Sequence, residues 1–188
     1  MVTEETKAIL QACIAEKRFC AVRNRLESEE RFLLPLRMEE EFWLSAVESE
    51  LKTDGFLIDR LSNIDQIHPS GDGSLELTAS LHIAETLRVP DIDLAAPDHI
   101  FAWLASSGCA VLLECVHPGR ADIDLFSCAV TDCTAETFDI RCFDADCRWK
   151  GGILTVPYDA VQRLSFGSGI LRSYEAVLPP MPGRKKQL

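Results

Sequence analysis

The sequence predicts a mainly β protein of the α+β class, built from two tandem units that each contain a helix followed by a curled five-stranded sheet. Three observations lead to this prediction. The chain has 188 residues, enough for two domains of roughly 90 residues. Apolar residues in both halves alternate at the period of half-buried strands, and these strands are separated by short polar or glycine-containing turns. The same apolar pattern occurs twice along the chain.

The repeat aligns two pairs of segments. Residues 6–22 and 95–111 both contain an apolar-periodic helix, a short break and a strand that opens on Cys-Ala-Val. Residues 42–67 and 138–164 both begin with an alternating strand. Further along these segments Gly55 matches Gly152, Ile64 matches Val161 and Ile67 matches Leu164. We interpret this repeat as an internal duplication.

Each unit is expected to open with a helix. The first spans residues 4–17, with apolar residues on one face and two basic residues at its C-terminal end. The second spans residues 97–107, because Pro97 suits the first helical position and Gly108 suits a helix stop. Helices over 74–87 and 168–178 close the two units. The expected strands are 19–26, 31–38, 41–49, 55–60 and 64–68 in the first unit, and 109–116, 123–131, 137–147, 152–157 and 161–166 in the second.

These elements predict domains at residues 1–88 and 89–180. The Pro- and Asp-rich stretch 88–98 is expected to link them. Residues 181–188, which contain Arg184-Lys185-Lys186, are expected to form a flexible basic tail.

A helix followed by five strands, with a one-turn break between the fourth and fifth, resembles the Sm-like (SH3-like) fold. The segments that carry the resemblance are TDGFLIDRLSNIDQI (53–67) and GGILTVPYDAVQRLSF (151–166). They are similar to the "DGF…L.DI..I" pattern of bacterial proteins built from this module, for which no activity is established. The resemblance implies two small β-barrels that pack as a pseudo-dimer.

The Sm family proper binds U-rich RNA through an Asp, a Met-Asn pair and an Arg-Gly pair. This chain contains no Met-Asn, and it has Asp54-Gly55 and Gly151-Gly152 where the Arg-Gly pair is expected. An aspartate repels phosphates, and the formal net charge of −11 opposes a partner that is held through phosphates. RNA binding is therefore the alternative function, and not the preferred one.

Motifs for catalysis and metal binding are missing from the sequence. No Gly-rich phosphate loop or HExxH arrangement occurs. The eight cysteines lack the C-x-x-C spacing of zinc sites; Cys115-Val116-His117 comes nearest. We expect buried structural thiols, no cofactor, no metal and no enzymatic activity. The aspartates at 144 and 146 are expected on the outward face of a strand.

The preferred function is a non-catalytic protein-interaction or assembly module. A curled sheet has edge strands that pair with other strands unless they are guarded. The candidate binding surface contains an aromatic residue between two cations and the two glycine turns; its residues are Arg148, Trp149, Lys150, Asp54, Gly55 and Gly152. The expected partner is a protein, with a homo-oligomer as a further arrangement. The first 88 residues contain 17 acidic and 10 basic side chains, so they are the expected contact for a basic partner. No segment has the roughly 18 apolar residues that a membrane span needs, and no signal peptide is apparent, so a cytoplasmic location is expected.

Overall fold

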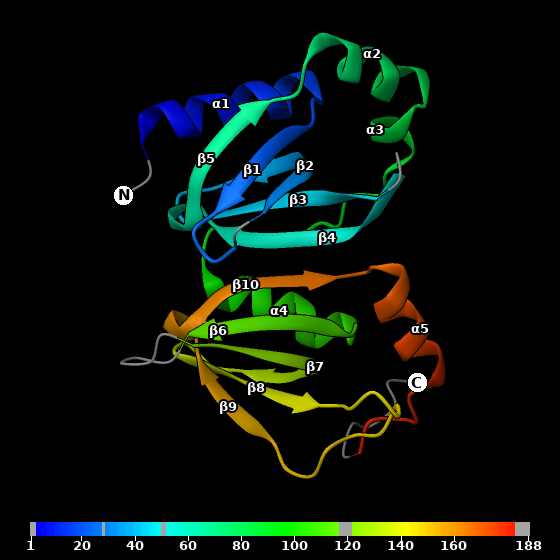
Figure 1. The fold of residues 1–188 in the computed structure, drawn as a ribbon. Coiled ribbons are helices and arrows are strands. Elements are labelled where there is room, and N and C mark those ends of the chain that lie inside the picture. Colours follow the sequence, from blue (N-terminus) through cyan, green and yellow to red (C-terminus); the bar gives the residue numbers. More distant parts are fainter. Residues whose placement is uncertain (1–2, 28, 50–51, 117–121, 183–188) are drawn as a thin grey trace. The chain divides into compact units, whose positions relative to one another are not determined.

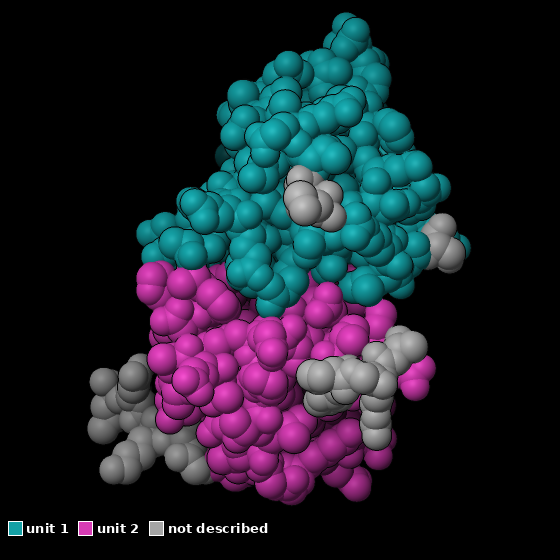
Figure 2. All heavy atoms as spheres, turned by 90° about the vertical axis from the view of Figure 1, so that its left-hand side faces the viewer, with its two compact units in different colours: residues 1–95 teal, residues 96–188 magenta. Residues whose placement is uncertain are grey.

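The computed structural model describes residues 3–27, 29–49, 52–116 and 122–182. The chain divides into two compact units, Met1–Ala95 and Ala96–Leu188 (Figure 2). Each unit contains an opening helix and five antiparallel strands, followed by further helical segments (Figure 1). Among the described residues, no helix is both long and apolar enough to cross a membrane.

Unit 1 begins with helix α1 (Glu4–Glu16). The Thr3 hydroxyl accepts the Thr6 amide, which satisfies one of the free N–H groups at the helix start. The helix ends at Lys17, whose backbone is left-handed with φ 52°, so that the Arg18 amide can donate to the Cys13 carbonyl. The strands that follow are β1 (Cys20–Asn24), β2 (Glu30–Met38), β3 (Phe42–Ser49), β4 (Lys52–Arg60) and β5 (Ile64–Pro69), with a 3₁₀ turn, η1 (Leu61–Asn63), between the last two.

Helices close unit 1 as α2 (Asp72–Ser80) and α3 (Ile83–Thr86). The sequence predicts a single helix here, but His82 adopts a left-handed backbone with φ 51° and interrupts it. This break directs Ile83 into a buried cluster with Phe19, Leu34 and Ala46.

Unit 2 repeats this order of elements. Helix α4 (Pro97–Ser107) has Pro97 in its first turn and ends at left-handed Gly108, as predicted. The strands are β6 (Val111–Val116), β7 (Ile123–Cys133), β8 (Thr137–Cys142), β9 (Leu154–Pro157) and β10 (Val161–Phe166), with a 3₁₀ turn, η2 (Tyr158–Ala160), before the last. One helix, α5 (Gly169–Val177), closes the unit.

The prediction of two closed barrels forming a pseudo-dimer is wrong, because the sheets are open. The strand order is β5-β1-β2-β3-β4 in unit 1 and β10-β6-β7-β8-β9 in unit 2. Within the described residues, β4 and β5 do not pair with each other, and neither do β9 and β10. Closing a sheet requires its end strands to pair. Here a helix covers the core face instead, since α1 packs on β2 and β5, and α4 packs on β7 and β8.

The cores of the two units differ in their packing. In unit 1, Leu10 and Cys13 of α1 are buried in one cluster with Trp43, Leu57 and Ile67. In unit 2, Phe101 of α4 stacks on Phe138, with ring centroids 3.7 Å apart, and Tyr158 stacks on Phe138 at 5.5 Å. The helix–sheet contact is therefore aliphatic around one tryptophan in unit 1 and aromatic in unit 2.

Strand register shows which residues of the two units are equivalent. Cys20 lies opposite Leu33 and Pro69, and Val111 lies opposite Cys128 and Phe166. Cys20 therefore corresponds to Val111, two residues beyond the Cys109 that the sequence repeat aligns with it. The sequence alignment misses this shift because it compares residue identities along the chain, whereas strand register is set by pairing across the sheet.

Candidate interaction site

The residues predicted to form a binding surface fall into two groups in different units. Asp54 and Gly55 lie within β4. Gly55 is buried with φ 83°, at a break in the β3–β4 register, where glycine allows the strand to bulge. Gly152 has φ 86° in an exposed turn before β9, and Arg148 and Lys150 are also exposed. The structure assigns Gly55 a structural role in the sheet.

Trp149 is held by the protein's own chain. Its indole N–H donates to the Pro179 carbonyl at 2.7 Å. Its ring meets Phe143 edge-on at 5.6 Å, and Phe143 in turn packs on Tyr174 of α5. This aromatic ring therefore forms part of the packing between the β8–β9 connection and the C-terminal helix, which leaves less of it available for stacking on a ligand.

The strand predicted over 137–147 ends at Cys142, so Asp144 and Asp146 lie in a turn. The Asp144 carboxylate accepts the backbone amides of Asp146 and Arg148, each at 3.0 Å. Asp144 thus organises the loop, and the prediction that these aspartates lie on a strand face is wrong. Aspartate favours turns because its side chain can accept a backbone amide two residues later. The prediction of a strand over 137–147 did not take this preference into account.

Unit 2 has a pocket of about 230 Å³ next to Trp149. Its walls include Glu175 and the C-terminal segment from Leu178 to Met181. Glu175 already accepts the Ala110 amide at 2.7 Å. The Trp149 indole N–H and a Glu175 carboxylate oxygen thus already form hydrogen bonds within the chain.

Unit 1 contains a more apolar pocket of about 190 Å³, between β2 and the helices α2 and α3. Phe32, Leu77 and Leu81 lie at this pocket with 51%, 42% and 47% of their surfaces exposed. The other lining residues come from the sheet and helices, and they are Phe19, Glu48, Ser74, Thr78 and Ile83. Sequence reasoning missed this pocket because its walls come from several segments spread over residues 19–83.

Local contacts hold the helical wall of this pocket in place. The Arg18 guanidinium donates to the Ser70 carbonyl at 3.0 Å and to the Asp72 carboxylate at 3.1 Å, which fixes the start of α2. The Thr78 hydroxyl donates to the Ser74 carbonyl at 2.7 Å, so Thr78 bonds within its own helix. The pocket is therefore preformed, and most of its exposed surface is apolar carbon.

The charged residues of this wall are acidic. Residues 70–87 contain Asp72, Glu76 and Glu85 and no lysine or arginine, and Glu48 lines the pocket from β3. The Asp72 carboxylate is paired with Arg18, while Glu76 and Glu85 are exposed. A basic ligand would therefore experience a favourable field here.

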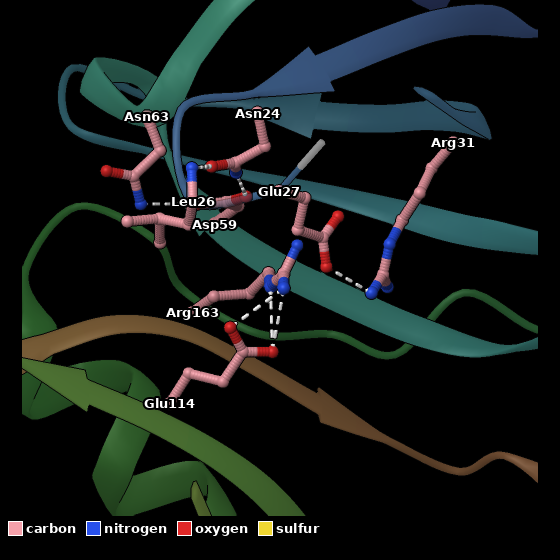
Figure 3. A network of polar contacts seen from close by, with 8 residues as sticks. All are labelled: Asn24, Leu26, Glu27, Arg31, Asp59, Asn63, Glu114 and Arg163. Atoms are coloured by element: carbon pink, nitrogen blue, oxygen red, sulfur yellow. Dashed lines mark hydrogen bonds and ion pairs between the residues drawn. The ribbon is translucent and has the colours of Figure 1, made fainter. Parts of the chain in front are cut away.

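Unit 1 also contains a buried polar network that the sequence did not reveal (Figure 3). Asp59 is 2% exposed, and its carboxylate accepts the side-chain amides of Asn24 at 2.6 Å and Asn63 at 2.8 Å. The Asn24 side-chain oxygen accepts the Leu26 amide at 2.8 Å. These bonds connect the end of β1, β4 and η1, so we assign this cluster a structural role.

A separate ion pair in unit 2 joins buried Arg163 to partly buried Glu114 (Figure 3). The Arg163 guanidinium of β10 bonds both oxygens of Glu114 on the neighbouring strand β6, at 2.8 Å each. A two-pronged contact of this kind satisfies both charges at once.

The described part of the chain shows no group of three or more His, Cys, Asp or Glu side chains that could hold a metal ion. His117 and the basic run 184–186 lie outside the described residues. Among the thiols, burial raises the pKa of Cys115 to about 12, helped by Asp124 and Glu114. Burial also raises the pKa of Tyr158 to about 12, and its hydroxyl donates to the Thr134 carbonyl at 2.7 Å. Both groups are thereby kept in their neutral, protonated forms.

The comparisons with known proteins supply no family for this chain. No family model, no curated protein and no solved structure matches it.

Proposed function

We propose that this protein is a non-catalytic protein-interaction module that binds a partner through the apolar pocket of unit 1. The observation that carries the proposal is the gathering of three large, half-exposed apolar side chains, Phe32, Leu77 and Leu81, at one preformed pocket. Contiguous exposed apolar surface is typical of interaction sites. The pocket volume of about 190 Å³ lies below the range of about 300–1,000 Å³ that holds small-molecule ligands, so it suits a single apolar side chain of a protein.

The partner segment that fits this site has basic residues beside its apolar anchor. The charges on α2, α3 and the β3 wall are acidic, and residues 1–95 contain 19 acidic and 10 basic side chains in total. Complementary charge steers association and selects between partners. A lysine or arginine beside the anchor would approach Glu48, which lines the pocket.

We also infer that the two units arose by internal duplication. The shared order of helix, strands and 3₁₀ turn supports this, as do register shifts at matching places, between Pro35 and Arg37 on β2 and between Val130 and Asp132 on β7. The helices after the fifth strand differ in number, because unit 1 has α2 and α3 whereas the described residues of unit 2 contain α5 alone. Ile83 of α3, which lines the proposed pocket, therefore has no counterpart in the described residues of unit 2.

Site-specific photo-crosslinking in the cells that make the protein tests the proposal. A benzophenone amino acid replaces Leu77, and in a matched control it replaces Val177, an exposed apolar residue of α5 in unit 2. We expect a discrete protein adduct from position 77 that is lost when Leu81→Asp is added, with no such adduct from position 177. Circular dichroism of the Leu81→Asp variant checks that its fold is intact.

Sequencing of the crosslinked peptide tests the partner chemistry. An apolar anchor beside lysine or arginine supports the proposal, whereas an acidic segment contradicts the predicted charge. Absence of a position-dependent adduct, or an adduct with RNA or with a second copy of this chain, would overturn the proposed interaction.

A further inference from the structure

Cys128 of β7 and Cys142 of β8 lie directly opposite each other in the unit 2 sheet. The amide of Phe143 donates to the Ser127 carbonyl at 2.9 Å, so this neighbouring pair is hydrogen-bonded across the strands. The Cys142 carbonyl instead accepts the Lys150 amide at 2.8 Å, on the side away from β7. Because antiparallel pairs alternate, Cys128 and Cys142 form a non-hydrogen-bonded pair.

A non-hydrogen-bonded pair has the spacing that a disulfide needs. Its Cα atoms are about 4.5 Å apart and its side chains lie on the same face of the sheet. Disulfides form across Cα separations of about 4.4–6.8 Å. The two thiols can therefore be joined with little movement of the backbone. Burial raises the pKa of Cys128, and the neighbouring Cys142 adds to this rise.

Access to the pair comes from the Cys142 side. Cys142 is half-buried, whereas Cys128 is fully buried. Lys150 partly offsets the effect of burial on the Cys142 pKa by favouring its thiolate. Cys142 is therefore the thiol that meets an oxidant first, and Cys128 is the thiol that resolves the product.

Unit 1 supplies an internal comparison. Cys13 and Cys20 also interact through their thiols, but they are 1% and 0% exposed. An oxidant cannot reach either sulfur while α1 is packed on the sheet. The same chain thus contains one neighbouring thiol pair with access to solvent and one without.

We propose that Cys128 and Cys142 are a redox modification site that forms a reversible disulfide by exchange with a low-molecular-mass disulfide such as oxidised glutathione. The Cys142 thiol loses its proton to solvent, and its thiolate attacks one glutathione sulfur. The S–S bond of oxidised glutathione breaks and one glutathione thiolate leaves. The Cys128 thiol then loses its proton, attacks the Cys142 sulfur and displaces the second glutathione. Two electrons pass from the protein to glutathione disulfide, and the two glutathione thiolates take up the two protons.

Incubation of the full-length folded protein with oxidised glutathione, followed by alkylation and non-reducing peptide mapping, tests this site. We expect a linked peptide joining Cys128 to Cys142, while Cys13 and Cys20 remain reduced. The linkage should stabilise unit 2, because it closes a loop in the unfolded chain, and raise its melting temperature by about 5 °C or more.

Three variants separate the possible outcomes. Cys128→Ser should trap a stable glutathione adduct on Cys142, and Cys142→Ser should leave Cys128 reduced and remove the shift in melting temperature. Cys133→Ser is the matched control on the same strand, since Cys133 faces Phe138, and it should retain the linkage. A Cys142 adduct that persists in the wild-type protein, or a predominant linkage from Cys128 to Cys109 or Cys115, would overturn the proposal.

Discussion

At the scale of single residues, the units differ in the polarity of three buried positions. Strand register places Asn24, Asp59 and Asn63 of unit 1 at the positions held in unit 2 by Cys115, Val156 and Ala160. Both sets are buried. The fold therefore accepts either a hydrogen-bonded network or a small apolar cluster here, provided that every polar group in the network is paired.

This comparison predicts a non-additive set of variants. Asp59→Val should lower the free energy of unfolding of unit 1 by about 3 kcal/mol, because the Asn24 and Asn63 amides lose their carboxylate acceptor while they remain buried. The triple variant Asn24→Cys, Asp59→Val, Asn63→Ala carries the unit 2 residues and should be less destabilised than the single variant. Urea unfolding followed through the amide signals of β4 measures both. A triple variant that is less stable than Asp59→Val would contradict this interpretation.

At the scale of elements, backbone conformation decides where helices and strands end. The sequence locates most ends correctly because they carry local signals, such as Pro97 and Gly108 around α4. It misses the break at His82 and the end of β8 at Cys142. Both depend on tertiary packing or on side-chain bonds to the backbone, which apolar periodicity does not report.

Two adjacent glycines provide a test at this scale. Gly151 and Gly152 both have open space where a Cβ would lie, but only Gly152 has a left-handed backbone, with φ 86°. Gly152→Ala should therefore cost unit 2 about 1 kcal/mol of stability, while Gly151→Ala should be neutral or slightly stabilising. Thermal unfolding of the two variants provides the comparison. Equal effects at both positions would show that the turn does not require the positive φ.

At the scale of the whole molecule, charge bears on the alternative function. The chain has a formal net charge of −11, and 19 of its 30 acidic residues lie within residues 1–95. Tight binding of single-stranded RNA needs clustered cations and aromatic rings that are free to stack. Trp149 is the aromatic residue predicted between two cations as a stacking platform. Its indole N–H is hydrogen-bonded to the Pro179 carbonyl and its ring packs on Phe143.

We therefore expect no binding of U-rich or A-rich oligonucleotides with a dissociation constant below about 100 µM at low salt. Fluorescence anisotropy with the full-length protein measures this, with a basic single-strand-binding protein as the positive control. Tight binding that weakens steeply as salt is added would favour the RNA alternative over the interaction module.

The sequence alone determined the α+β class of the protein and most of the order of its elements, because apolar periodicity and turn residues are local signals. Tertiary structure decided three further points: that the sheets are open, that Cys128 faces Cys142, and that Phe32, Leu77 and Leu81 share one pocket. Each of these depends on strand pairing or packing between segments distant in the chain. Such contacts are set by the summed energetics of the folded unit, and no local pattern of residues records them.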